Sequence, residues 1–250
     1  MTFSLAAAAI DVVLLDIEGT TTPIEFVHRT LFSYARERVR GFLEASAGDP
    51  AVNAALAGLR EEHRADAAAG ESPPDWRDDS AGVGLTSAAT YVHWLIDRDR
   101  KSRWLKELQG RIWEEGYRSG SLHGEVYPDV PDALARWTGA GRRAGIFSSG
   151  SVLAQKLLFA HSTAGDLTPF LRWHFDTAVG AKRESSSYGR IADTIGISPA
   201  RILFISDVSA ELEAAEAARL RTLLCDRQGT GTSDSGIRHA VIRSFEQVTV

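Results

Sequence analysis

The chain of 250 residues is long enough for one large domain, or for a core domain that holds a sizeable insertion. Hydrophobic residues make up 44% and charged residues 24% of the total, which is typical of a globular protein and excludes wholesale disorder. The formal charge of −5 argues against a general nucleic-acid binder, and no apolar run reaches the roughly 18 residues that span a bilayer. We therefore expect neither nucleic acid nor a membrane as a partner.

The N-terminal run LAAAAIDVVLLD (5–16) is not typical of a signal peptide, because it lacks a positively charged start and Asp11 interrupts it. Its second half, VVLLD (12–16), is predicted to be a buried strand. The single Cys225 excludes an internal disulfide and suits a reducing cytoplasm. We expect this thiol to be a small buried hydrophobic group, because no positive group stands beside it to activate it.

The region from 26 to 123 has helical patterns and no convincing strand, which predicts a helical domain inserted after the first strand. We therefore expect a core domain formed by 1–25 and 124–250, with 26–123 as a cap over one edge of its sheet. Within the cap the helical patterns cover 31–45, 53–69 and 90–120.

A segment rich in glycine, proline and aspartate, GESPPDWRDDSAGVG (70–84), is expected to separate the second and third cap patterns. The aromatic side chains of the cap are expected to pack between helices rather than to form a ligand cage. They are Trp94, Trp104, Trp113 and Tyr117.

The second half of the chain alternates apolar runs with helical patterns, which predicts a doubly wound α/β fold with a mainly parallel sheet. The further strands are expected at 144–149, 201–207 and 221–226. The helical patterns cover 130–141, 151–162, 187–196 and 209–220. Ser151 could cap the second of these helices.

Polar groups follow three of the predicted strands: Asp16 with Glu18, Ser148 with Ser149, and Asp207. In an open α/β sheet, ligands bind where the carboxyl ends of the strands meet the loops. Two acids at that edge would repel unless a cation lay between them, and oxygen ligands without Cys or His favour Mg²⁺. Each acid taken alone could equally be a cap or turn residue, but their recurrence favours a metal site.

The sequence SSGS (148–151) follows a strand and opens a helix, so its hydroxyls and N–H groups could hold an anion. A plain serine N-cap explains the same pattern equally well. Lys182 stands just before another helical stretch, where a solvated charge is the usual interpretation.

Together these motifs resemble the four motifs of the haloacid dehalogenase superfamily: an Asp-x-Glu-Gly-Thr turn, a serine, a lysine and an S-D-V-x-x-E-L stretch. Within it, the chain is similar to the enolase-phosphatase family of methionine salvage, in which Glu18 replaces the aspartate of most relatives. The resemblance covers nearly the whole chain except the 45–90 region. Its most similar stretches are LLDIEGTTTPIEFV (14–27), LQGRIWEEGYRSGSLHGEVYPDVP (108–131), SSGSVLAQKLLFAHSTAGDLTPF (148–170), HFDTAVGAKRESSSYGRIA (174–192) and ILFISDVSAELEAA (202–215).

The resemblance implies that Asp16 is the nucleophile and that Glu18 is the acid and base beside it. It implies one Mg²⁺ per chain, bound by Asp16, Glu18 through its backbone carbonyl, and Asp207. Ser148, Ser149 and Lys182 would bind the phosphoryl oxygens.

Two further residues have open roles at this stage. Thr20 could order the turn after Asp16. Glu211 could face the metal through water or lie on the surface of its helix.

The family converts 2,3-diketo-5-methylthiopentyl-1-phosphate to an acireductone by enolisation and dephosphorylation. The resemblance also implies that the protein is a monomer. The base that enolises the substrate is not readable from the sequence. Alternatives are a phosphatase of another small phosphorylated metabolite, a non-catalytic binding protein, and a haloacid dehalogenase proper. The retained acids, Asp207 among them, argue against the last two.

Overall fold

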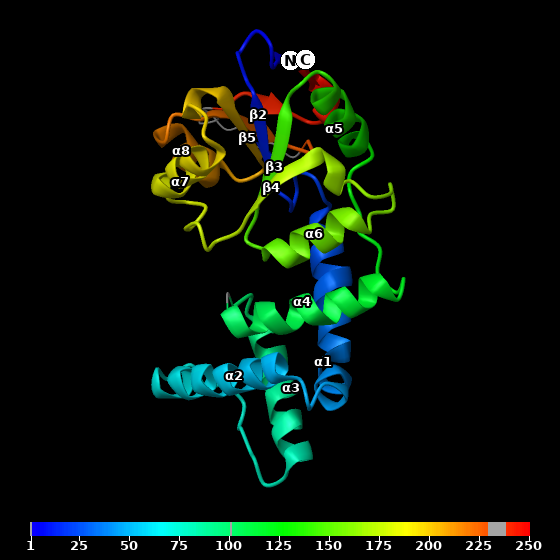
Figure 1. The fold of residues 1–250 in the computed structure, drawn as a ribbon. Coiled ribbons are helices and arrows are strands. Elements are labelled where there is room, and N and C mark those ends of the chain that lie inside the picture. Colours follow the sequence, from blue (N-terminus) through cyan, green and yellow to red (C-terminus); the bar gives the residue numbers. More distant parts are fainter. Residues whose placement is uncertain (1, 101, 230–238) are drawn as a thin grey trace. The chain divides into compact units, whose positions relative to one another are not determined.

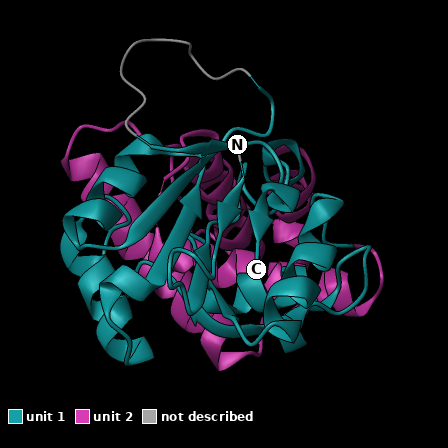
Figure 2. Ribbon diagram, turned by 90° about the horizontal axis from the view of Figure 1, so that it is seen from above, with its two compact units in different colours: residues 1–27, 123–250 teal, residues 28–122 magenta. Residues whose placement is uncertain are grey.

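A computed structural model describes residues 2–100, 102–229 and 239–250. The chain forms two compact units, which Figure 2 distinguishes by colour. The sheet unit comprises Met1–Val27 and His123–Val250, and the helical unit comprises His28–Leu122. The role of the helical unit as a cap stays a prediction. A helix with the length and apolarity to cross a membrane is absent from the described residues.

The sheet unit contains a six-stranded parallel sheet with the strand order β4-β3-β2-β5-β6-β7 (Figure 1), as the sequence predicted. Its strands are β2 (Val12–Leu15), β3 (Arg143–Phe147), β4 (Leu171–Phe175), β5 (Ile202–Ser206), β6 (Arg221–Cys225) and β7 (Val241–Ile242). A second, two-stranded parallel sheet pairs β1 (Phe3–Ser4) with β8 (Val248–Thr249). The four strands expected from apolar runs are present, whereas β1, β4, β7 and β8 were not predicted.

Helices cover both faces of the six-stranded sheet (Figure 1). Val12 and Leu14 of β2 pack in one core cluster with residues of α7 and α8, including Ile191 and Leu212. Helix α5 contacts β3 and α6 contacts β4. The helices are α5 (Asp129–Gly139), α6 (Val152–Ala160), α7 (Ser185–Ile195) and α8 (Ser209–Ala217), with short 3₁₀ turns at η2 (Thr168–Phe170), η3 (Pro199–Arg201) and η4 (Phe245–Gln247). The Ser151 side chain caps α6 as expected, accepting a hydrogen bond from the N–H of Ala154 at 3.3 Å.

The strand order places a topological switch beside β2. After β2 the chain passes through the helical unit and α5 to β3, whereas after β5 it continues through α8 to β6. Because α5 and α8 lie on opposite faces, the connections after β2 and β5 diverge at their carboxyl ends, which is where ligands bind in such sheets. The register pairs Leu15 with Ile146 and with Ile205, so Asp16 follows β2 at the level of the ends of β3 and β5.

The helical unit consists of η1 (Phe26–Phe32, a π-helix that begins at the unit boundary), α1 (Ser33–Ala45), α2 (Pro50–Ala68), α3 (Ala81–Asp97) and α4 (Arg103–Arg118). The third pattern, predicted as one helical stretch from 90 to 120, forms two helices. Asp99 takes a positive φ of 47°, and the Ser102 side chain caps the start of α4. The start of α3 lies inside the predicted breaker segment, because Ser80 caps it.

Trp104 and Trp113 of α4 pack between helices, as expected. Trp113 stacks on Phe32 of η1 at 6.4 Å between ring centroids, and the Trp104 indole lies against Gly58 of α2. Trp94 stacks on Tyr91 of its own helix, α3, at 5.6 Å. The indole N–H of Trp113 also donates to the carbonyl of Leu31 at 2.8 Å.

Candidate active site

The carboxyl group of Asp16 is buried and bonded on both oxygens. Its Oδ1 accepts from Lys182 Nζ at 2.6 Å and from the N–H of Ile17 at 2.8 Å, and its Oδ2 lies 3.2 Å from the Ser206 hydroxyl. The Asp16 N–H donates to the carbonyl of Ile205 at 3.0 Å, which continues the ladder between β2 and β5 by one residue. The strand pairing therefore fixes the backbone that presents this carboxylate.

Lys182 lies between two carboxylates, at 2.6 Å from Asp16 and 2.6 Å from Glu211. Its side chain is only 10% exposed, so it is not the solvated charge that a loop lysine usually is. Burial alone would lower the pKa of Lys182, but the two carboxylates outweigh burial and raise it. The ammonium group is thus held in its charged form beside Asp16.

Glu211 is not a surface carboxylate, so of its two alternatives the one on the helix surface is wrong. It is buried in α8, contacts Lys182 directly, and lies 3.0 Å from the Ser206 hydroxyl. Burial and the charge of Asp16 raise the pKa of Glu211. Ser206, which the sequence analysis did not single out, bridges Glu211 and Asp16 from the end of β5.

The residues after Asp16 form a tight turn, here called the Asp16 turn (16–22). The N–H groups of Thr21 and Thr22 both donate to the carbonyl of Ile17 at 2.9 Å, and the N–H of Gly19 donates to the carbonyl of Thr22 at 2.9 Å. The hydroxyl that orders the turn belongs to Thr21, since it lies 3.1 Å from the Asp16 carbonyl. Thr20 takes part in the turn through its backbone carbonyl, which is hydrogen-bonded, whereas its hydroxyl has no partner among the described residues.

Asp207 follows β5 and lies against the Asp16 turn. Gly19 has a φ of +69°, and a Cβ there would lie 2.2 Å from Asp207 Oδ2, so glycine is required both by conformation and by space. Burial, and after it the charge of Asp16, raises the pKa of Asp207 to about 7. The site thus holds acidic groups that are close enough to disfavour one another's ionisation.

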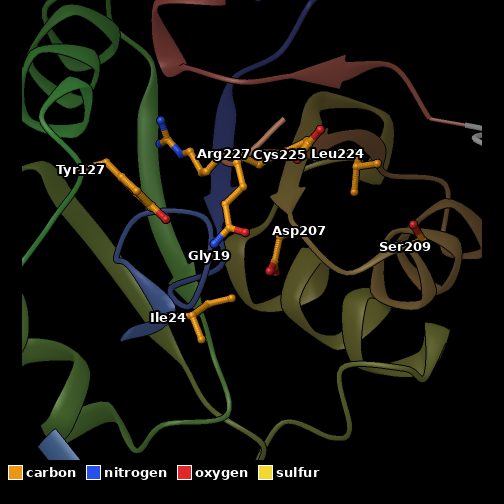
Figure 3. Close-up of a pocket in the computed structure, with 10 residues that line it drawn as sticks. Gly19, Ile24, Tyr127, Asp207, Ser209, Leu224, Cys225 and Arg227 are labelled. Atoms are coloured by element: carbon orange, nitrogen blue, oxygen red, sulfur yellow. The ribbon is translucent and has the colours of Figure 1, made fainter. Parts of the chain in front are cut away.

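A pocket of about 330 Å³ opens beside Asp207 in the sheet unit (Figure 3). Gly19 and Ile24 line it from the region of the Asp16 turn, and Leu224, Cys225 and Arg227 line it from the end of β6 and the loop beyond. Cys225 is 1% exposed, and burial raises the pKa of its thiol to about 12, so the expectation of an inert buried cysteine is met.

The two serines follow the end of β3, as expected. Ser148 is buried, and its hydroxyl accepts from the N–H of Gly150 at 3.2 Å. Ser149 is half-buried in the bend that leads to α6, and Glu18 is half-buried in the Asp16 turn. Because β3 is the neighbour of β2, Ser148 and Asp16 lie at the same edge of the sheet.

Comparison with known proteins decides the family. A family model of haloacid dehalogenase-like hydrolases matches residues 10–219. The chain is 51% identical to enolase-phosphatase E1 of Synechococcus elongatus, over 96% of this chain and 98% of the relative. It is 46% identical to enolase-phosphatase E1 of Sorangium cellulosum, over 98% and 99% of the two chains. The chain belongs to the enolase-phosphatase E1 family of haloacid dehalogenase-like hydrolases.

Solved structures agree with this membership. The UTR4 protein of Saccharomyces cerevisiae is 32% identical to the chain, with a TM-score of 0.75 over 95% of this chain and 99% of that one. CbbY of Rhodobacter sphaeroides, which is 16% identical with a TM-score of 0.54, shares the fold. The resemblance inferred from the motifs is therefore confirmed at the level of the family.

The residues of this family member fit a hard divalent cation. Asp16 and Asp207 are carboxylates at the same end of the sheet, and oxygen donors of this kind suit Mg²⁺ together with water. The raised pKa of Asp207 indicates acidic groups whose repulsion a cation would relieve.

Proposed function

We propose that the protein is a Mg²⁺-dependent enolase-phosphatase that converts 2,3-diketo-5-methylthiopentyl-1-phosphate to 1,2-dihydroxy-3-keto-5-methylthiopentene and phosphate. The observation that supports this reaction best is the 2.6 Å contact between Asp16 and the buried ammonium of Lys182 at the mouth of β2. A carboxylate and a fixed positive charge at one point suit nucleophilic attack on a phosphoryl group. The full-length similarity to enolase-phosphatase E1 relatives supports the choice of substrate.

In the first half of the dephosphorylation, a carboxylate oxygen of Asp16 attacks the phosphorus atom. A bond forms between this oxygen and phosphorus, and the bond from phosphorus to the substrate oxygen breaks. Glu18 donates a proton to the departing oxygen, so the alcohol leaves neutral and Asp16 becomes an aspartyl-phosphate.

In the second half, Glu18 takes a proton from a water molecule that attacks the phosphorus atom. The bond from phosphorus to the Asp16 oxygen breaks, phosphate leaves, and both carboxyl groups return to their starting states. Lys182, Ser148 and Ser149 bind the phosphoryl oxygens throughout, with Lys182 supplying a full positive charge.

Asp16, the carbonyl of Glu18 and Asp207 would hold one Mg²⁺. When bound, this ion supplies positive charge that offsets the phosphoryl oxygens and polarises a substrate carbonyl toward the enol. Glu211 does not touch the substrate in this scheme. It is a second carboxylate beside Lys182, so that the ammonium stays charged and in place.

The test measures loss of the diketone by ultraviolet absorbance and release of phosphate, with and without Mg²⁺, for the wild type and Asp16→Asn. Phosphate release should vanish in the variant and in the metal-free sample. Asp166→Asn is the matched control, because Asp166 is an exposed loop carboxylate of the same unit and should leave turnover unchanged. Normal turnover by Asp16→Asn would overturn the nucleophile assignment.

A phosphatase of another small phosphorylated metabolite is the second candidate, since the Asp16 and Lys182 geometry serves any phosphate ester equally. Wild-type activity on simple phosphate esters without activity on the diketone would favour it. We also propose a cytoplasmic monomer. The single, buried Cys225 supports the location, and the family resemblance supports the oligomeric state.

A further inference from the structure

Arg227 is a buried arginine at the same edge of the sheet as Asp16, two residues beyond β6. Its side chain is only 7% exposed. The guanidinium donates to the carbonyl oxygen of Thr20 from both Nε, at 3.0 Å, and Nη2, at 2.8 Å. Two of its nitrogens therefore hold a single carbonyl in the Asp16 turn.

The guanidinium is itself fixed from three other sides. Its Nη1 lies 2.6 Å from Asp129 Oδ2, and that oxygen also accepts from the Ser244 hydroxyl at 2.9 Å and from the N–H of Phe245 at 2.5 Å. The rings of Tyr127 and Phe245 lie 4.4 and 4.5 Å from its central carbon. Arg227 thus ties the turn to α5 and to the C-terminal segment of the sheet unit.

The bonded carbonyl lies two residues after Glu18 and four after Asp16. The next carbonyl of the turn, that of Thr21, accepts from the N–H of Tyr127 at 2.9 Å. Two consecutive carbonyls are therefore held by groups outside the turn. β2 holds the start of the turn and these outer bonds hold its far side, with Glu18 midway between.

We propose that Arg227 is a positioning residue. Its two hydrogen bonds to the Thr20 carbonyl, here called the Thr20 grip, fix the position of the Glu18 carboxyl relative to Asp16. This inference rests on the proposed acid and base role of Glu18. It assigns no contact of Arg227 with substrate. A catalytic group displaced by about 1 Å can cost about 100-fold in rate, so loss of the grip should lower turnover rather than binding.

Arginine suits this task better than lysine. The planar guanidinium reaches one carbonyl with two nitrogens and one carboxylate with the third, in a fixed geometry. A single ammonium in its place would keep the charge beside Asp129 but could not hold the carbonyl in the same way. Arg227→Lys is therefore a variant that preserves the ion pair and removes the bidentate grip.

The kinetic test compares Arg227→Ala and Arg227→Lys with the wild type on the diketone phosphate in the presence of Mg²⁺. Arg136→Ala is the control, because Arg136 also bonds carbonyls of the C-terminal segment, those of Phe245 and Val248, but not the turn. In Arg227→Ala, kcat should fall by about 30- to 100-fold with KM changed by less than about threefold. Guanidinium ion added at low millimolar concentration should raise kcat of Arg227→Ala, but not of Arg136→Ala.

A second measurement does not depend on turnover. Hydrogen exchange of peptides that cover 16–22 should be faster in Arg227→Lys than in the wild type, and unchanged in Arg136→Ala. If Arg227→Ala does not fold, Arg227→Lys provides both readouts. A kcat loss no greater than that of Arg136→Ala, or unaltered exchange in the turn, would overturn the inference. An inactive wild type would overturn the proposed function instead, and the exchange data would still test the grip.

Discussion

The two units bury charged groups in different ways (Figure 2). In the helical unit, the buried carboxylate of Asp66 accepts from the Tyr91 hydroxyl at 2.7 Å and pairs with Arg100 at 2.6 Å. The buried charge of Asp66 is thus matched by a guanidinium and a hydroxyl donor, although Arg100 also lies 3.9 Å from the exposed Glu71. In the sheet unit, Asp16 and Glu211 share the single ammonium of Lys182, and Asp207 lies near them.

This difference distinguishes buried charges that stabilise the fold from buried charges that bind a ligand. A satisfied pair such as Asp66 and Arg100 stabilises the packing of helices and needs no ligand. The crowded acids of the sheet unit are unfavourable on their own, as the raised pKa values of Glu211 and Asp207 show. Such an arrangement is retained where a ligand completes it, so excess buried charge marks the functional site.

The largest effect is expected for Lys182→Met, which removes the positive charge that pairs with both Asp16 and Glu211. Phosphate release should fall by about 1,000-fold, because the phosphoryl oxygens lose a charged donor. The free energy of unfolding should fall by about 3–5 kcal/mol, since two buried carboxylates are left unpaired. Urea titration and phosphate assays measure both effects. Lys156→Met, at an exposed lysine of α6, should change neither quantity. If Lys182→Met were as stable as the wild type, the contrast between the two units would be wrong.

The central strands could be predicted because they are buried on both faces and therefore appear as unbroken apolar runs, as Val12–Leu15 does. The edge strand β4 could not be predicted from the sequence. Only Leu171 in it is fully buried, and Arg172 is exposed, so its residues show no apolar run. The break after α3 depends on a single positive φ at Asp99, which no periodicity reveals.

The candidate site was predictable where a polar residue directly follows a buried strand, as Asp16 and Asp207 do. Contacts between residues far apart in the chain could not be predicted. Arg227 and Asp129 are 98 residues apart, and only the fold shows that they meet. For Glu211 the sequence left open a position near the metal and one on the helix surface, and the packing of α8 shows that it is buried.

Gly19→Ala probes the crowded site without changing a charge. A Cβ at a φ of +69° and 2.2 Å from Asp207 Oδ2 must displace that carboxylate or the turn. We expect activity to fall by about 100-fold and stability by about 1–3 kcal/mol. Gly139→Ala, at the end of α5 with open space around it, should leave activity unchanged and stability equal or slightly higher. Equal behaviour of the two variants in phosphate assays and urea titrations would contradict the role of Gly19.

Asp66→Asn tests the other side of the comparison. It leaves Arg100 and the Tyr91 hydroxyl without their charged partner, so stability should fall by about 2–3 kcal/mol. Turnover per folded molecule should equal that of the wild type, because the pair serves only the packing of the helical unit. Thermal unfolding followed by circular dichroism, with kcat measured well below the transition, checks both. A fall in kcat without a fall in melting temperature would show that Asp66 is functional.

The smallest effect is expected from Asp129, a buried carboxylate of the sheet unit whose Oδ2 pairs with Arg227 and accepts from Ser244 and Phe245. Burial alone would raise its pKa, but Arg227 and the bonds from Phe245 and Ser244 together lower it below the ordinary value of 3.8. The Asp129 carboxyl therefore binds a proton more readily in the unfolded chain than in the folded one. Its ionised form stabilises the folded state above about pH 4, and this stabilisation is lost as pH falls through the folded pKa. The difference in unfolding free energy between the wild type and Asp129→Asn should be constant from pH 7 to about 5 and shrink by about 1 kcal/mol toward pH 3. Urea titrations of both proteins across this range measure it, and a difference that grows toward low pH would mean that the carboxyl is not held by Arg227.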